Sequence, residues 1–427
     1  SPDPKDPNNP HGGSNIEPVK HNRDKNGKDI DGKERLAGST NNYVGKMDLD
    51  QFKGDKSDKA AISRGFGFGD TWDKKALNFD VNKVTITTSD EVGKGETIDP
   101  STFVATTYTS LDEVKADKDA SAFLENAGIK VDFDKYNLTL WKAKDSQDFY
   151  NKYVVTGTNL YFHMPMDVKS EMAQAGGEYT NKVFQVTFGN GYDGNVVVNK
   201  VPTIKPEKDV VIDVSDPTSI NDAVVPLGEI RSYKLVGGKV DKEAVSGLFQ
   251  YGFSDKLDTA HDLYTDYYRV KLANDVTLKD GTVVSKDDVA KYGKAAFKDG
   301  VWTFEFDKAF LDNLSGKEDF QAIAYIEFKR IATGDVYNEY TNTINGVEYL
   351  SNKVVTHTPE PPKPETPAKP GVPTPEAPKP QAPATPERKV LPNTGDKGNT
   401  AMTAIGITTL AGVTAATLAK RYSRKED

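Results

Sequence analysis

Half of the prolines of this chain lie in one short stretch near its C-terminal end. Of 24 prolines, twelve fall between Pro359 and Pro386, where they alternate with Glu, Lys, Ala and Thr. Proline fixes one backbone torsion and lacks an amide hydrogen, so such a stretch forms neither helices nor central strands. It favours extended polyproline II structure and reaches roughly 90 Å at about 3.1 Å per residue. We therefore expect folding to end near residue 357 and residues 358–390 to form a spacer.

The chain after the spacer, residues 391–427, ends in a motif, an apolar run and a basic tail. In order they are Leu391-Pro392-Asn393-Thr394-Gly395, the uncharged run Ala401–Ala419, and Lys420–Lys425. Such a run is long enough to cross a bilayer, and the basic tail would hold its end in the cytoplasm. This order resembles the sorting signal of Gram-positive surface proteins. The resemblance implies cleavage by sortase after Thr394, linkage of the Thr394 carboxyl to peptidoglycan, and a transmembrane segment before cleavage. An ordinary tail anchor with a chance motif is the alternative.

Composition excludes several classes of function. The chain has no cysteine, which rules out disulfides, zinc–thiolate sites, iron–sulfur clusters and cysteine nucleophiles. A net charge of -9 argues against nucleic acid and anionic membrane surfaces as partners. No Ser-His-Asp arrangement, phosphate-binding loop or dinucleotide fingerprint occurs, so no enzymatic activity is predicted.

One segment resembles the beginning of a calcium-binding loop. It reads Asn22-x-Asp24-x-Asn26-Gly27, but Lys33 stands where such a loop supplies a bidentate glutamate. We therefore expect a polar β-turn here, and no metal ligand or cofactor is assigned. Calcium at a site that the sequence does not locate is left open.

Strand patterns dominate residues 19–357. Alternating polar and apolar residues predict strands at 183–188, 301–306 and 322–331. Helical patterns are short and cover four ranges: 111–126, capped by Ser110 and ended by Gly128, then 146–153, 285–292 and 307–314. Many strands with few helices are typical of β-sandwiches with inserted helices.

A weak internal repeat divides this region in two. Three residues recur with identical spacing, as Ile30, Gly38 and Tyr43 and as Ile220, Gly228 and Tyr233. Three stretches repeat in the same order: Phe68–Asp73 with Phe253–Asp258, Gly177–Asn181 with Gly334–Asn338, and Asn199–Val201 with Asn352–Val354. Each copy begins with a lysine beside an apolar strand, Lys20 or Lys208. The repeat predicts tandem domains at 19–201 and 202–357, with residues 1–18 as a linker.

The repeated order of Lys, Asp and Asn suggests a self-made covalent bond. A lysine amine and an asparagine amide can condense to an isopeptide bond and release ammonia. Burial favours the neutral lysine that this requires. A buried carboxylic acid kept protonated can polarise the asparagine carbonyl. Lys20 with Asn181, and Lys208 with Asn338, stand at suitable positions, but solvated strand-edge lysines and turn asparagines are the alternative.

Several stretches resemble the C-terminal region of the streptococcal antigen I/II surface adhesins. They are Asp48–Ser57, Phe188–Tyr192 followed by Val196–Asn199, Lys329–Ala332, and Asn345–Val347 leading into Ser351–Val354. The resemblance covers residues 19–357 and continues through the spacer and the sorting signal. It implies two variant immunoglobulin-like sandwiches, each with a Lys–Asn isopeptide bond assisted by an Asp.

Carried onto this sequence, the family pattern assigns the bonds Lys20–Asn181 and Lys208–Asn338. Asp70 and Asp255 are the assigned assisting acids, because both copies place them after Phe-x. The alternatives left open are Asp73, Asp80, Asp258 and Asp262 for the acids and Asn342 for Asn338.

These patterns together predict a mainly β, non-enzymatic, wall-proximal segment of a secreted adhesin. The resemblance implies sortase and peptidoglycan as partners, and host glycoproteins, matrix proteins or other microbes as ligands. A pilus subunit, or the anchoring region of a surface hydrolase, is the alternative function.

Overall fold

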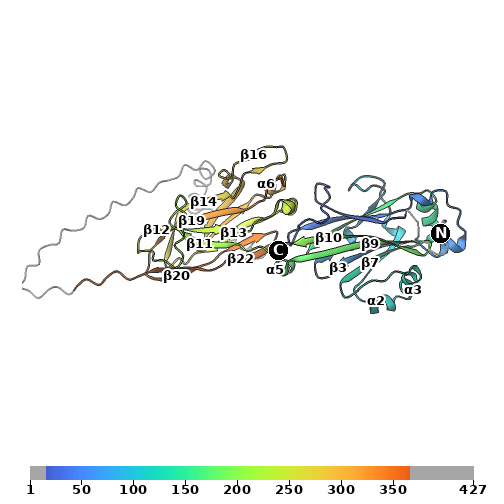
Figure 1. Cartoon of the computed structure of the whole chain (residues 1–427), viewed down its shortest axis with the longest axis horizontal. Coiled ribbons are helices and arrows are strands. Elements are labelled where there is room, and N and C mark those ends of the chain that lie inside the picture. Colours follow the sequence, from blue (N-terminus) through green and yellow to red (C-terminus); the bar gives the residue numbers. More distant parts are fainter. Residues whose placement is uncertain (1–15, 366–427) are drawn as a thin grey trace, which may run out of the picture.

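The computed structural model of this chain describes residues 16–365, which form mainly antiparallel β-sheets with short helices. Each sheet draws its strands from only one part of the chain, residues 19–201 or 207–358. The two parts lie end to end as an elongated body (Figure 1). The prediction of two tandem, mainly β sandwiches with inserted helices is confirmed.

The first sandwich packs two five-stranded sheets face to face. One sheet has the order β1 (Val19–Arg23), β2 (Thr40–Met47), β8 (Leu160–Val168) and β4 (Leu77–Phe79), and β5 (Thr85–Thr87) also pairs with β8. The other has the order β10 (Asn190–Val201), β9 (Gly177–Thr187), β3 (Gly67–Asp73), β7 (Tyr136–Ala143) and β6 (Phe103–Tyr108). The Phe68 and Phe162 rings stack between the sheets with centroids 4.2 Å apart.

The second sandwich repeats this plan with a shorter insert. One sheet is β11 (Glu207–Val211), β12 (Ile230–Val236), β19 (Ala322–Arg330) and β14 (Asp262–Leu272). The other is β17 (Gly293–Lys298), β18 (Val301–Phe306), β13 (Tyr251–Lys256), β21 (Thr341–Ile344) and β22 (Val347–Leu350). Two small pairs complete it, β15 (Val276–Thr277) with β16 (Val283–Val284) and β20 (Gly334–Asn338) with β23 (Val354–Thr358).

Short helices connect and cover the sheets. In the first sandwich they are η1 (Asp50–Phe52), α1 (Lys59–Ser63), η2 (Val81–Lys83), η3 (Pro100–Thr102), α2 (Leu111–Ala116), α3 (Lys118–Ala127), α4 (Ser146–Phe149), η4 (Tyr150–Val154) and α5 (Met172–Ala175). In the second they are η5 (Lys242–Gly247), η6 (Ala290–Tyr292) and α6 (Lys308–Asp312).

Two predicted helices differ from the structure. The helix expected over 111–126 is divided at Asp117, whose side chain caps α3 by accepting from the Ala120 amide at 3.2 Å. Of the range 285–292, only the single turn of η6 is helical.

Burial on both faces makes β3 the centre of the first sandwich. Its residues Phe68, Asp70 and Trp72 alternate toward the other sheet, while α3 covers its outer face with Phe123. All seven residues of β3 are therefore buried, including two aspartates. An inward-facing aspartate in such a core requires a specific partner.

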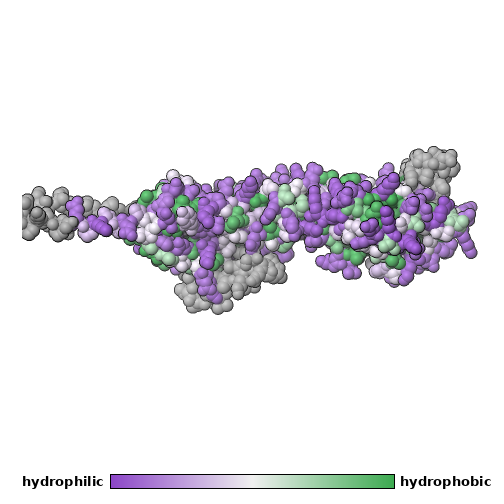
Figure 2. All heavy atoms as spheres, turned by 90° about the horizontal axis from the view of Figure 1, so that it is seen from below, coloured by the Kyte–Doolittle hydropathy of each residue, from purple (hydrophilic) through white to green (hydrophobic). Residues whose placement is uncertain are grey.

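The outer surface is mostly hydrophilic, and apolar residues form only small separate areas on the face that Figure 2 shows. Among residues 16–365, no helix is long and apolar enough to cross a membrane. The predicted transmembrane segment and the sorting-signal residues Leu391 to Gly395 lie outside the described residues.

Candidate cross-linking sites

Lys20, Asp70 and Asn181 meet inside the first sandwich. The Nζ atom of Lys20 donates hydrogen bonds to Oδ2 of Asp70 and to Oδ1 of Asn181. None of the three residues is exposed to solvent. Three residues that are far apart in the sequence therefore form one buried polar cluster between the two sheets.

The strand arrangement explains why these side chains meet. Lys20 lies on β1 in one sheet, whereas Asp70 and Asn181 lie on neighbouring strands β3 and β9 of the other sheet. In the register of these strands, Asn181 is opposite Trp72, one inward position after Asp70. The cluster thus bridges the two sheets between the first strand and the next-to-last strand of the domain.

Burial shifts the protonation of this cluster toward the neutral forms. Desolvation lowers the pKa of the Lys20 amine to about 8, although the adjacent Asp70 opposes the shift. Desolvation also raises the pKa of the Asp70 carboxyl, opposed by Lys20 and Asn181. A neutral amine beside a protonated acid is the state that amide formation requires.

The second sandwich holds a related cluster, in which the lysine contacts the aspartate but has no hydrogen bond to the asparagine. The Nζ atom of Lys208 on β11 donates a hydrogen bond to Oδ2 of Asp255 on β13, and both side chains are fully buried. Burial lowers the pKa of Lys208 and raises that of Asp255, each opposed by the partner. Asn338 on β20 is 5% exposed. Its side chain is close enough to the Asp255 carboxyl to lower the pKa of that acid, against the effect of burial. Among the described residues, neither its Oδ1 nor its Nδ2 has a hydrogen-bond partner.

A tyrosine ring lies beneath each lysine. The Lys20 Nζ is 4.1 Å from the centre of the Tyr43 ring, and the Lys208 Nζ is 4.4 Å from that of Tyr233. These tyrosines were not among the predicted site residues. The signal was nevertheless present, because both belong to the internal repeat with identical spacing.

An asparagine side chain also holds the backbone of each lysine. Asn195 accepts from the Lys20 amide at 2.7 Å and donates to the Lys20 carbonyl at 2.8 Å. Asn352 does the same for Lys208 at 2.8 and 2.9 Å. The repeat as aligned from sequence paired Asn352 with Asn199 instead, so the structural equivalence of Asn195 was missed.

The alternative acids have other partners in the structure. Asp262 accepts from Tyr233 and, at 2.8 Å, from Arg330 Nε. Asp258 lies 2.9 Å from His261, Asp73 accepts from the Lys75 amide, and Asp80 accepts from the Asn82 amide. The alternative amide, Asn342, accepts from the Gly238 amide at 2.8 Å and donates to the Gly252 carbonyl at 2.9 Å.

The segment that resembles a calcium loop forms a turn. Oδ1 of Asp24 accepts hydrogen bonds from the Asn26 amide at 2.9 Å and the Lys28 amide at 3.0 Å. Within residues 16–365, no group of three or more acidic or histidine side chains could hold a metal ion.

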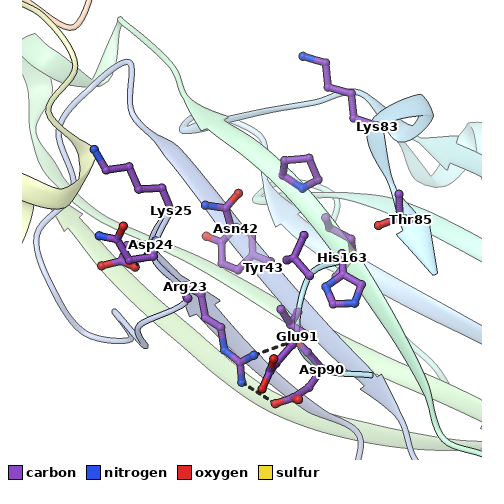
Figure 3. A pocket seen from close by; sticks show the side chains of 16 residues that line it. Arg23, Asp24, Lys25, Asn42, Tyr43, Lys83, Thr85, Asp90, Glu91 and His163 are labelled. Atoms are coloured by element: carbon purple, nitrogen blue, oxygen red, sulfur yellow. Dashed lines mark hydrogen bonds and ion pairs between the residues drawn. The ribbon is translucent and has the colours of Figure 1, made fainter. Parts of the chain in front are cut away.

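A cleft of about 780 Å³, lined by both polar and apolar residues, lies on the outer face of the first sandwich. Figure 3 shows Arg23 on one wall, bound to Asp90, with Lys83 and Thr85 across the cleft. Asn42 on β2 contributes to the floor. The side chains of Asn42, Lys83 and Thr85 all line this cleft.

Comparison with protein families gives three matches. Residues 18–201 match the cell surface antigen I/II C2 terminal domain, and residues 205–359 match the cell surface antigen C-terminus. Residues 383–425 match the LPXTG cell wall anchor motif. The matched families are surface antigens and not enzymes, as predicted.

Relatives of known sequence or structure point to the same family as these matches. The chain is 34% identical over 371 residues to the Aggregation substance of Enterococcus faecalis. The matched region covers 83% of this chain but only 28% of that relative. It is 34% identical to the C-terminal domain of the Streptococcus pyogenes antigen I/II-family protein AspA, covering 81% of this chain and all of that one, with a TM-score of 0.66. The C-terminal domain of the Streptococcus agalactiae antigen I/II polypeptide BspA is 33% identical. The match covers 80% of this chain and all of that one, with a TM-score of 0.63.

These matches correct one prediction. The C-terminal signal was predicted to be transmembrane, but the matched family identifies it as an LPXTG anchor to the cell wall. The transmembrane prediction is therefore wrong.

Proposed function

The chain belongs to the antigen I/II family of cell-wall-anchored surface adhesins, and from this we propose that its two sandwiches are each closed by an intramolecular isopeptide bond. The bonds would join Lys20 to Asn181 and Lys208 to Asn338. The observation that carries the proposal is the contact of the buried Lys20 amine with both Asp70 and Asn181.

The chemistry follows from the protonation of the cluster. The neutral Lys20 Nζ attacks Cγ of Asn181, and Asp70 hydrogen-bonds the oxygen on which negative charge develops. A proton passes from the attacking nitrogen through the Asp70 carboxyl to the Nδ2 group. The Cγ–Nδ2 bond then breaks and ammonia leaves. Atoms balance without a cofactor, and each site reacts once.

The fold supplies the remaining requirements. The two sheets hold amine and amide in contact, which replaces a bimolecular encounter with a fixed approach. The surrounding core excludes water that would compete as a nucleophile. The two ends of Lys20 are held separately. The Tyr43 ring packs against its amine, and the Asn195 side-chain amide binds its backbone.

Asn338 suits the second bond better than Asn342. A reacting amide loses its Nδ2 group, so an amide that holds backbone groups would sacrifice those hydrogen bonds. Asn342 forms hydrogen bonds with two backbone groups, whereas the buried Asn338 amide forms none with the backbone of the described residues.

The bonds would stabilise the domains mainly by restricting the unfolded chain. Lys20 and Asn181 are 161 positions apart. Closing a loop of that length destabilises the unfolded state by about 5 kcal/mol in the chain-entropy model. Because the chain has no cysteine, such an amide would take the place of a disulfide.

Intact mass tests this proposal. The purified chain should weigh less than its sequence predicts by two ammonias, one per domain. Asp70→Ala should restore one of them, and Asp255→Ala the other. The full calculated mass in the unsubstituted chain would overturn the proposal, and loss of both ammonias in Asp70→Ala would show that another group assists.

We also propose that the domains contribute to attachment to host glycoproteins or other microbes. This cleft of the first sandwich supports the proposal, because Asn42, Thr85 and Lys83 offer donors and acceptors suited to sugar hydroxyls. Its volume is that of an ordinary small-ligand site. Binding of the chain to an immobilised host glycoprotein should fall when the glycans are removed enzymatically, and also with Asn42→Ala plus Lys83→Ala. Unchanged binding in both tests would exclude the cleft.

A further inference from the structure

The last three strands of the second sandwich, β21, β22 and β23, lie outside the loops that the proposed bonds close. One loop ends at Asn181 and the other runs from Lys208 to Asn338. Residues 339–358 follow the second bond and belong to neither loop. We infer that β23, which ends this stretch, is a mechanical clamp through which tension from the cell wall enters the folded chain. The inference rests on the proposed cross-links.

The order of elements along the chain defines the path of force. The matched anchor region, residues 383–425, follows β23 in the sequence. Tension from the wall therefore reaches Thr358 first and must pass through β23 before it reaches the covalent bond at Asn338. Figure 1 shows β20 and the chain that leaves β23 at the end of the molecule far from the first sandwich.

The pairing of β23 places its hydrogen bonds in shear. It runs antiparallel to β20, with Asn338 opposite Val354 and Gly334 opposite Thr358. On its other side, His357 forms a parallel bridge with Val224. A pull along the strand at Thr358 loads the bonds on both sides together, so they cannot open one at a time.

A buried arginine strengthens this clamp. Arg330 is completely buried, and its two terminal nitrogens donate at 2.7 Å to the hydroxyls of Thr356 and Thr358. Its Nε donates at 2.8 Å to Asp262. Arg330 therefore ties the strand that carries the load to a charged pair inside the sandwich.

The exposed side of β23 is tied as well. His357 lies between two carboxylates, with Nδ1 2.7 Å from Asp335 and Nε2 2.7 Å from Asp222. The Thr358 hydroxyl also donates to the Val225 carbonyl at 2.6 Å. These contacts hold the last two residues of the strand, where tension arrives.

The stretch between the two loops, residues 182–207, is held more extensively. There β10 pairs with β9 over ten positions, against five for β23 with β20. The carbonyls of Val198 and Lys200 also accept from the Gly32 and Arg35 amides at 2.7 and 2.8 Å. We therefore expect β23 to yield first.

The covalent bond limits what the clamp can release. Release of β23, followed by β22 and β21 behind it, frees residues 339–358 and adds roughly 70 Å of extended chain at about 3.5 Å per residue. Without the bond, unravelling of residues 208–358 would release roughly 500 Å by the same measure. The clamp thus gives a wall-anchored chain a short, bounded extension before tension reaches the cross-links.

Single-molecule pulling on the full chain, with handles at its two ends, tests the inference. The first step should lengthen the chain by roughly 70 Å. Arg330→Met should lower the force of this step but leave its length unchanged. Thr356→Val with Thr358→Val, which retains the buried Arg330–Asp262 pair, should have the same effect. Arg231→Met is the matched control, because Arg231 is an arginine of the same sheet that pairs with Glu229 and not with β23.

The mass of the same sample separates the two proposals. If a chain that has lost two ammonias lengthens by much more than roughly 70 Å in its first step, the clamp is overturned but the cross-links are not. An unchanged force in both Arg330→Met and the threonine variant would also overturn it. Long steps in a chain of full calculated mass would overturn the proposed cross-links and the clamp with them.

Discussion

The Nζ atom of Lys208 lies 4.4 Å from the centre of the Tyr233 ring, and the hydroxyl of that tyrosine donates a hydrogen bond to Asp262. The first sandwich has the same ring beneath its lysine but not the same hydroxyl bond. Tyr43 lies 4.1 Å from the Lys20 Nζ, and among the described residues its hydroxyl has no hydrogen-bond partner. The two sites therefore share a ring and differ in how it is held.

This difference predicts unequal effects of removing the hydroxyl. Tyr233→Phe leaves one oxygen of a buried carboxylate without its donor, so we expect a loss of about 1–3 kcal/mol in unfolding free energy. Tyr43→Phe removes no hydrogen bond and should cost less than about 1 kcal/mol. Chemical denaturation of each variant measures this. Both variants should still lose two ammonias, because both retain the ring, and equal destabilisation would contradict the prediction.

The two candidate asparagines of the second sandwich can be separated by substitution. Asn338→Ala should retain one ammonia and lose the stabilisation of the closed loop, about 4–5 kcal/mol in the chain-entropy model. Asn342→Ala should still lose two ammonias. It should nevertheless be destabilised by about 1–3 kcal/mol for each backbone group left unpaired, at Gly238 and Gly252. The opposite assignment follows if the mass changes only in Asn342→Ala.

Much of the fold and of the site follows from local patterns. Alternation predicted the strands that became β18 and β19, and the repeat brought Lys20, Asp70 and Asn181 into one hypothesis. A repeat preserves order along the chain, and two copies with the same order meet the same geometric requirement. Those residues could therefore be proposed without knowing which strands pair.

What the sequence did not reveal depends on tertiary contacts. Asn195 and Asn352 hold lysines that are 175 and 144 positions away, and no local pattern marks such a role. Arg330 reads as a surface charge at the end of a strand, yet it is fully buried because Asp262, Thr356 and Thr358 surround it. The divided helix at 111–127 depends on one capping aspartate within a continuous helical pattern.

The buried lysine predicts a pH dependence that appears only when the bond cannot form. In Asn181→Ala, Lys20 remains an amine, and burial holds its folded pKa at about 8, below its ordinary value of 10.5. The unfolded state then binds more protons between these values, so stability should rise as pH increases from about 8 to 10. Melting temperatures across that range measure it. Lys20→Met with Asn181→Ala should show no such rise, and an equal rise in the double variant would contradict the prediction.

His357 predicts the opposite sign at lower pH. Its hydrogen bonds to Asp222 and Asp335 raise the pKa of the imidazole above its ordinary value of 6.5. Because the folded pKa is the higher one, its stabilisation is complete below about 6.5 and is lost as pH rises through the folded pKa. We expect β23 to yield at a lower force at pH 8.5 than at pH 5.5. His357→Gln should yield at the same low force at both values, since glutamine carries no charge to pair with the two carboxylates. A pH dependence that persists in His357→Gln would assign it to another group.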